Sequence, residues 1–155
     1  MQFHLLCVSK PVKGWVKTAC DDYEKRLGGR FKNQLKFQVK EIAPVTHDDG
    51  RKAKEAERLM AAAPKNCLKL VLDERGKHLS STQLAEQITN WQNEAIDVAC
   101  FIGGADGLSK DLLNSADLNW SISKFTLPHQ IVRLVFTEQI YRAVSIINNH
   151  PYHRV

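Results

Sequence analysis

Two kinds of apolar pattern alternate along this chain. Some stretches are short and almost wholly apolar, as in strands buried on both faces of a sheet, and they lie at 3–8, 67–72 and 98–102. Others carry apolar side chains at helical spacing, and they lie at 15–27, 52–63, 80–91 and 130–148. Strands that alternate with helices predict an α/β fold with a mostly parallel sheet and helices on both faces.

Turn-forming residues predict the boundaries of these elements. Gly28-Gly29 is expected to end the first helix, and residues 73–77 are expected to turn the chain toward a helix that starts with the capping-box pattern Ser80-x-x-Gln83. Ser109 can cap a short helix that ends near 116. The other predicted segments are a half-exposed strand over 35–40, a loop over 45–51, and β structure over 120–127 that ends at Pro128. Without a repeat or linker, residues 1–155 are expected to form a single domain.

The composition excludes several classes of protein. No apolar run is long enough to span a membrane and no signal-peptide pattern begins the chain, so a cytoplasmic protein is expected. The four cysteines are scattered and lack zinc-site spacing, which predicts reduced thiols and no metal. Residues 1–40 hold nine Lys/Arg against three acids. That excess suits a polyanion such as nucleic acid, although a solubilising surface would have the same composition.

Three segments follow predicted strands, where parallel sheets bind ligands: 72–73, 103–107 and 122–128. In the second, Gly103-Gly104-x-x-Gly107 would let backbone approach a ligand closely, or would simply form a tight turn. It is not a dinucleotide fingerprint, and the chain has no phosphate-binding loop, nucleophile elbow or paired-histidine zinc pattern.

The C-terminal tail concentrates groups that can bind RNA or move protons. It contains His150, Tyr152, His153 and Arg154, and His129, Arg133 and Arg142 lie along the helix before it. A frayed terminus without function is the alternative.

Four segments carry a resemblance to a known family: Leu70-Val71-Leu72-Asp73, residues 101–108 (FIGGADGL), residues 121–129 (SISKFTLPH) and residues 149–154 (NHPYHR). In order, spacing and total length the chain resembles the bacterial ribosomal large subunit methyltransferase H family, of the SPOUT (trefoil-knot) class. Ala105 and Asp106 stand where many members have Pro and Glu.

The resemblance implies a homodimer with a C-terminal trefoil knot that binds S-adenosylmethionine. The cofactor would contact, largely through backbone groups, Leu72, Gly103, Ile122, Ser123, Lys124, Phe125, Thr126 and Leu127. The implied reaction is methylation of N3 of a pseudouridine in helix 69 of large-subunit ribosomal RNA on the assembled ribosome. The basic residues of 1–40 would then meet RNA phosphates.

Methyl transfer of this kind needs alignment and removal of an imide proton rather than a nucleophile. His153 and His129 are candidates to remove the proton, unless water accepts it in a positive environment. Arg142, Arg154 and Tyr152 could hold the RNA base, its phosphate or its developing charge. Glu138 is expected to pair with Arg142 at the i+4 position.

Packing roles are predicted for the remaining large side chains. Trp15, Trp91 and Trp120 are expected to pack, and the stripe Ile131, Val135, Ile140 and Ile147 to lie in the core or a dimer interface. Two other functions remain open: a ribosome-binding protein without catalysis, and a methyltransferase of the same class that acts on transfer RNA.

Overall fold

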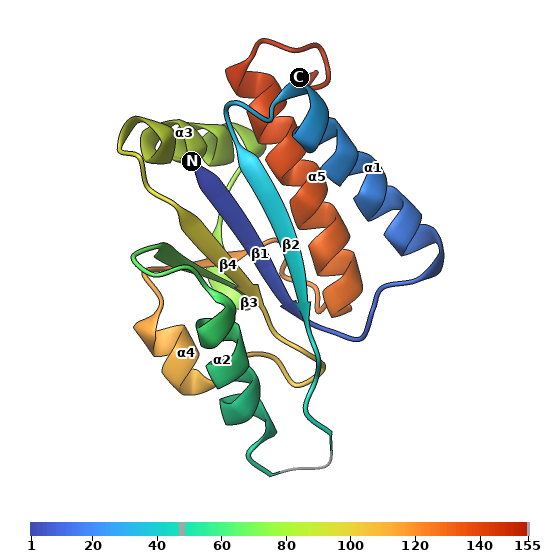
Figure 1. The fold of residues 1–155 in the computed structure, drawn as a ribbon, viewed down its shortest axis with the longest axis vertical. Coiled ribbons are helices and arrows are strands. Elements are labelled where there is room, and N and C mark those ends of the chain that lie inside the picture. Colours follow the sequence, from blue (N-terminus) through green and yellow to red (C-terminus); the bar gives the residue numbers. More distant parts are fainter. Residues whose placement is uncertain (47–48, 155) are drawn as a thin grey trace.

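The computed structural model describes residues 1–46 and 49–154, and it contains strands that alternate with helices (Figure 1). In chain order the elements are β1 (Gln2–Val8), α1 (Gly14–Arg30), β2 (Lys36–Ile42), α2 (Arg51–Ala62), β3 (Leu68–His78), α3 (Ser81–Asn93), β4 (Val98–Ile102), α4 (Lys110–Ser115), β5 (Leu118–Ser121) and α5 (His129–Ile147). The predicted α/β alternation is confirmed.

The strands form one sheet in the order β2-β1-β4-β3-β5, and every pairing in it is parallel. Leu5 of β1 pairs with Val39 of β2 on one side and with Cys100 of β4 on the other. The apolar runs therefore form the centre of the sheet, as their composition predicted. The trefoil knot implied by the resemblance concerns how loops thread rather than strand order, and it stays a prediction.

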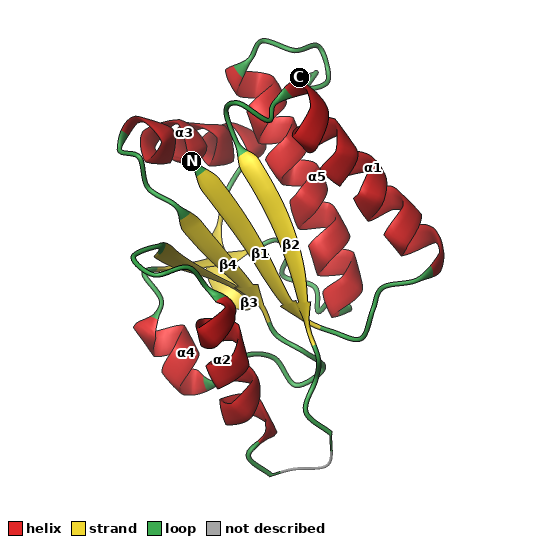
Figure 2. Ribbon diagram, in the orientation of Figure 1, coloured by secondary structure: helices red, strands yellow, loops and turns green. Residues whose placement is uncertain are grey.

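Helices cover both faces of the sheet, which confirms that prediction (Figure 2). Alternate residues of β1 show the division: Phe3, Leu5 and Cys7 pack with residues of α1, α3 and α5, whereas Leu6 and Val8 pack with residues of α2 and α4. Because side chains alternate across a strand, one apolar run supplies both cores.

The tryptophans divide into two that pack and one that does not. Trp91 of α3 and Trp120 of β5 stack with ring centroids 5.6 Å apart. Trp15 is 68% exposed, so the prediction that it packs is wrong. Its neighbour Val16 is the residue that contacts α5, and one position along a helix turns a side chain by more than a quarter of a circle.

Three predicted boundaries are wrong, each for a local reason. Helix α1 continues through Gly28-Gly29 to Arg30, because Leu27 and Phe31, one turn apart, are both buried. Strand β3 continues through the expected turn to His78, with an irregularity after Leu72. Strand β5 ends at Ser121 instead of extending to 127.

The helix-capping predictions are confirmed. The Ser80 side chain accepts a hydrogen bond from the Gln83 backbone and the Gln83 side chain accepts one from the Ser80 backbone, which forms the predicted capping box. The Ser109 side chain caps α4 in the same sense. The loop predicted over 45–51 includes two residues, 47 and 48, that lie outside the described residues.

Within residues 1–46 and 49–154, no helix is both long and apolar enough to cross a membrane. In the same part of the chain, no three His, Cys, Asp or Glu side chains cluster in a way that could hold a metal ion. All four cysteines are free thiols, and burial raises the pKa of Cys7 to about 12.

Candidate active site

A cavity of about 660 Å³ opens at the carboxyl ends of β4 and β5, beside residues 72–75 of β3 and against the start of α5. All three segments singled out from the sequence line it. The lining residues include Leu72, Asp73, Glu74, Ile102, Gly103, Gly104, Gly107, Ser121, Ile122, Ser123, Phe125, Thr126, Leu127 and His129. Parallel strands place their carboxyl ends at one edge, so residues far apart in sequence converge there.

Two serines build the loop from 122 to 127 after β5 ends. The Ser121 hydroxyl donates to the Ser123 carbonyl at 2.8 Å, and the Ser123 hydroxyl accepts from the Phe125 N–H at 2.9 Å. Such side-chain bonds to nearby backbone compete with a sheet ladder, which is why the strand stops here. Every residue of this loop lines the cavity except Lys124, which is exposed.

The glycine loop after β4 forms a closed turn that serves as one wall of the cavity. The Gly107 N–H donates to the Gly104 carbonyl at 3.0 Å, and Gly107 has φ +76°. A Cβ on Gly103 would lie 2.6 Å from the Gly107 carbonyl carbon, closer than any real contact. The turn itself therefore requires these glycines, and it presents backbone rather than side chains to the cavity.

Charged groups of β3 border the cavity. The Thr126 hydroxyl donates to the Glu74 carboxylate at 2.9 Å, which joins the 122–127 loop to β3. Burial tends to raise the pKa of Asp73, but hydrogen bonds from Arg75 outweigh it and lower that pKa below its ordinary value. The border of the cavity thus carries both acidic and basic side chains, with Asp73 paired to Arg75, beside largely backbone walls.

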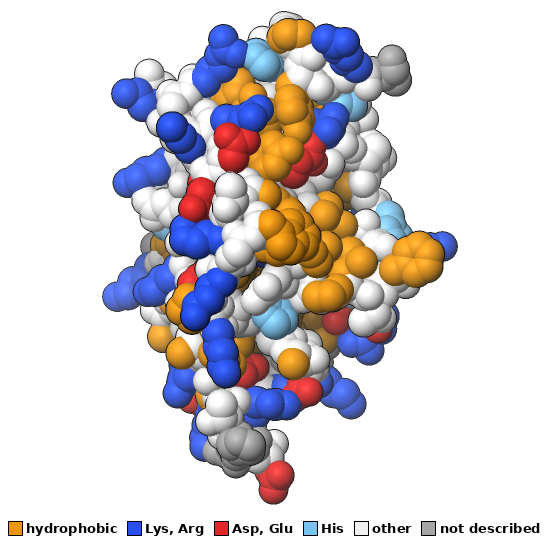
Figure 3. Space-filling view, turned by 90° about the vertical axis from the view of Figure 1, so that its right-hand side faces the viewer, with side chains coloured by type: hydrophobic (Ala, Val, Ile, Leu, Met, Phe, Trp, Pro, Cys, Tyr) orange, Lys and Arg blue, Asp and Glu red, His pale blue; other side chains and the backbone are white. Residues whose placement is uncertain are grey.

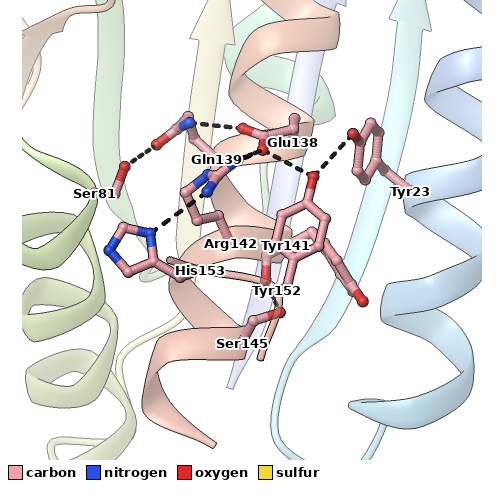
Figure 4. Close-up of polar contacts among 9 residues, drawn as sticks. All are labelled: Tyr23, Ser81, Glu138, Gln139, Tyr141, Arg142, Ser145, Tyr152 and His153. Atoms are coloured by element: carbon pink, nitrogen blue, oxygen red, sulfur yellow. Dashed lines mark hydrogen bonds and ion pairs between the residues drawn. The ribbon is translucent and has the colours of Figure 1, made fainter. Parts of the chain in front are cut away.

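A second cluster lies around Arg142, on the later half of α5 (Figure 4). Arg142 donates two hydrogen bonds to Glu138, which confirms the predicted ion pair. The Tyr152 hydroxyl bonds the same carboxylate at 3.0 Å, and His153 Nδ1 lies 3.4 Å from Arg142 Nη1. The tail as far as His153 is therefore packed against the helix rather than frayed.

The structure separates the sequence-predicted candidates into two groups. His129 lines the cavity, whereas Arg142, Tyr152 and His153 belong to the second cluster. Arg142 lies thirteen residues beyond His129, about 20 Å along the helix. Arg154 follows the second cluster and is exposed. Within one chain, then, the tail does not reach the cavity.

Arg133 has a different role from the one that its position suggested. It is 7% exposed, and its guanidinium donates to Glu41 and, at 3.3 Å, to Glu24. This arrangement ties α5 to α1 and β2 in the interior. Arg133 is therefore a structural residue rather than a phosphate ligand.

Sequence reasoning missed three members of the second cluster: Tyr23, Ser81 and Gln139. The Tyr23 hydroxyl lies 3.0 Å from that of Tyr152, and the Ser81 hydroxyl donates to Gln139 at 2.6 Å. Tyr23 and Ser81 belong to α1 and α3, far from the tail in sequence. No local pattern could have revealed them, because only the packing of α5 between these helices brings them there.

The side of the molecule formed by α1 and α5 has an apolar centre with basic side chains around it (Figure 3). Exposed Trp15 and half-buried Ile131, Leu134 and Val135 belong to this side. Some of the basic excess of 1–40 is neutralised locally, since Lys17 pairs with Asp21 and Arg26 with Asp22.

Comparison with known proteins gives concordant matches. The family model described as "Predicted SPOUT methyltransferase" matches residues 1–153. "Ribosomal RNA large subunit methyltransferase H" of Paraburkholderia phymatum is 42% identical and that of Paraburkholderia xenovorans 43%, each over all of both chains. The protein of the same name from Methylobacillus flagellatus is 39% identical over 99% of both.

A solved structure, a probable methylase family protein from Haemophilus influenzae Rd KW20, has a similar fold. It matches with a TM-score of 0.59 at 14% identity, over 99% of this chain and 70% of that one. At this identity the likeness supports the fold alone.

Proposed function

The chain belongs to the SPOUT methyltransferase family, and we propose that it transfers a methyl group from S-adenosylmethionine to N3 of a pseudouridine in helix 69 of large-subunit ribosomal RNA, on the assembled ribosome in the cytoplasm. The observation that carries the proposal is the cavity at the carboxyl ends of β4 and β5, beside residues 72–75 of β3. Three of the segments that carry the resemblance contribute residues to its lining. The chain is also about 40% identical, over its full length, to proteins named as ribosomal RNA methyltransferases.

The cavity suits a nucleoside-sized cofactor. Its volume of about 660 Å³ lies within the range of small-molecule sites, and its walls combine apolar side chains with backbone of the glycine loop and the 122–127 loop. Leu72, Gly103 and the run from 122 to 127, apart from Lys124, line the cavity and would hold S-adenosylmethionine, as the resemblance implies. When bound, this cofactor supplies a methyl group activated by its sulfonium.

The residues of this chain would then align the RNA base and accept the proton that leaves its imide nitrogen. His129 lies in the cavity wall and can receive it directly. His153 has Nδ1 facing Arg142, and a guanidinium only donates, so Nδ1 accepts and the proton of a neutral ring sits on Nε2. His153 in this arrangement serves as a hydrogen-bond donor to RNA rather than as a base, and water remains the other acceptor for the proton.

A homodimer would bring the two separated groups together. If two α5 helices pack antiparallel about a two-fold axis near Val135, the tail half of each lies beside the cavity half of the other. The apolar centre of the α1 and α5 side supports this interface, because it would cover exposed Trp15 and half-buried Ile131 and Val135. Arg142, Tyr152, His153 and Arg154 of one subunit would then face the partner's cavity, and exposed lysines of 1–40 would meet RNA phosphates.

The decisive experiment measures transfer of labelled methyl from S-adenosylmethionine to ribosomes that lack this modification. Separated subunits, naked ribosomal RNA and transfer RNA serve as parallel substrates. Labelling of large-subunit RNA in assembled ribosomes alone, mapped to the pseudouridine of helix 69, is expected. Labelling of transfer RNA would show that the protein is a methyltransferase with a different substrate. Ribosome binding without labelling would show that it is a binding protein without catalytic activity.

A further inference from the structure

We infer that Tyr23, on α1, is a positioning residue for methyl transfer, because its hydroxyl holds Tyr152 and thereby the tail that carries His153 and Arg154. The inference rests on the proposed function. It goes beyond it in assigning a role to a residue outside the cavity, the glycine loop and the tail.

The direction of the hydrogen bonds follows from the groups present. The Glu138 carboxylate pairs with Arg142 and can only accept, so the Tyr152 hydroxyl donates to it across 3.0 Å. The Tyr152 hydroxyl has a single proton, so it cannot also donate to Tyr23. The Tyr23 hydroxyl, 3.0 Å away, must donate to the Tyr152 oxygen, giving the chain Tyr23 to Tyr152 to Glu138 (Figure 4). Consecutive bonds of this kind polarise and strengthen one another.

Glu138 is the fixed end of this chain of hydrogen bonds. One carboxylate oxygen accepts from Arg142 and Tyr152, and the other accepts from the Gln139 side chain at 2.6 Å. Gln139 in turn accepts from Ser81 on α3. The tyrosine pair therefore connects the tail to α1 and α5 directly and to α3 through Gln139.

The Tyr152 ring is held as firmly as its hydroxyl. It packs edge-on against Tyr141 with centroids 4.7 Å apart, and the Arg142 guanidinium lies 4.8 Å from its centroid. Burial, and then the hydrogen bonds with Tyr23 and Glu138, raise the pKa of Tyr152 well above its ordinary value. The phenol thus stays protonated and can keep donating.

Tyr152 is the last firm anchor before the end of the described chain. The tail reverses at Asn149, with φ +51°, and the His150 N–H donates to the Ser145 carbonyl at 2.8 Å. Beyond Tyr152, His153 has only the longer contact to Arg142, and Arg154 is exposed. The placement of these two residues is therefore set by where Tyr152 is held.

The test removes one hydroxyl and keeps every ring. Tyr23→Phe deletes the donor to Tyr152, and Tyr152→Phe deletes both bonds. Tyr141→Phe is the matched control, because the Tyr141 ring belongs to the same aromatic cluster and lies near Arg26, but its hydroxyl is not part of the Tyr23–Tyr152–Glu138 chain of hydrogen bonds. Each variant is compared with the wild type by amide hydrogen exchange of residues 150 and 152–154, by cofactor Kd, and by kcat on ribosomes.

In Tyr23→Phe we expect faster exchange in the tail and kcat lower by about 3- to 30-fold, because a lost hydrogen bond displaces the tail rather than unfolding it. Cofactor Kd should stay unchanged, since neither Tyr23 nor Tyr152 lines the cavity. Tyr152→Phe should show the same changes more strongly, and Tyr141→Phe neither. Unchanged tail exchange in Tyr23→Phe would overturn the anchoring. Unchanged kcat beside an active wild type would overturn the role of Tyr23 as a positioning residue. An inactive wild type with faster exchange in Tyr23→Phe would instead refute the proposed function while supporting the anchoring.

Discussion

Arg142 and Glu138 lie one turn apart on α5, and Arg142 donates hydrogen bonds to Glu138 from two of its nitrogens. The third guanidinium nitrogen of Arg142 points toward His153. Glu138 therefore sets the orientation in which Arg142 meets the tail. We expect Glu138→Gln to lower kcat on ribosomes at least tenfold while costing only about 1 kcal/mol of unfolding free energy, because the pair is partly solvated. Glu86→Gln, on an exposed position of α3, is the control for the change of charge. Wild-type kcat in Glu138→Gln would show that the orientation of Arg142 is unimportant.

A charge in the centre of the α1 and α5 side should prevent dimerisation. Val135→Glu is expected to sediment as a monomer that binds S-adenosylmethionine with unchanged Kd but transfers no methyl, since each cavity would lack the partner's tail. Asn90→Glu adds the same charge at an exposed position of α3 and should change neither property. A monomeric Val135→Glu protein with full activity would refute the shared site.

The two candidate histidines should differ in importance. Because His129 lines the cavity and His153 faces Arg142, we expect His129→Ala to lower kcat about 100-fold, as for loss of a proton acceptor, and His153→Ala to lower it less. His78→Ala, at an exposed position of β3, is the control. Near-normal turnover in both candidates would assign proton removal to water.

Two glycines should respond oppositely to alanine. A Cβ on Gly76 would lie 2.4 Å from the Trp120 backbone, so Gly76→Ala must push β3 and β5 apart and should cost about 2 to 3 kcal/mol of unfolding free energy. A Cβ on Gly28, inside α1, meets nothing within 4 Å, and Gly28→Ala should gain about 0.5 to 1 kcal/mol. Urea denaturation of the two variants checks both signs, and equal midpoints would contradict the explanation.

Glu24 should make stability depend on pH. Burial raises its pKa despite the attraction of Arg133. A carboxyl group whose pKa is higher in the folded state stabilises the fold below its unfolded pKa, and this contribution is lost as the pH rises through the folded-state pKa. Glu24→Gln removes the effect, so its stability relative to the wild type should improve as the pH rises above 4.5, the ordinary glutamate value. A difference between the two urea midpoints that is independent of pH would contradict this.

The candidate site was only partly predictable from sequence. Leu72, Gly103 and the segment from 122 onward could be placed at one edge of the sheet, although β3 continues past Leu72 to His78. The pairing of Glu138 with Arg142 follows from helical spacing. The course of 122–127 was mistaken for strand, because apolar residues there resemble a strand while the hydroxyls of Ser121 and Ser123 bend the backbone into a loop.

The sequence by itself determined the α/β class, the order of elements and the edge of the sheet that carries the cavity, because these depend on local periodicity and on the geometry of parallel strands. Only the tertiary structure decided that Tyr23 meets Tyr152, that Arg133 is buried against Glu41, and that the tail lies away from the cavity of its own chain. Periodicity says which face of a helix is buried, but the partner of that face depends on how whole elements pack, and that is a property of the folded chain.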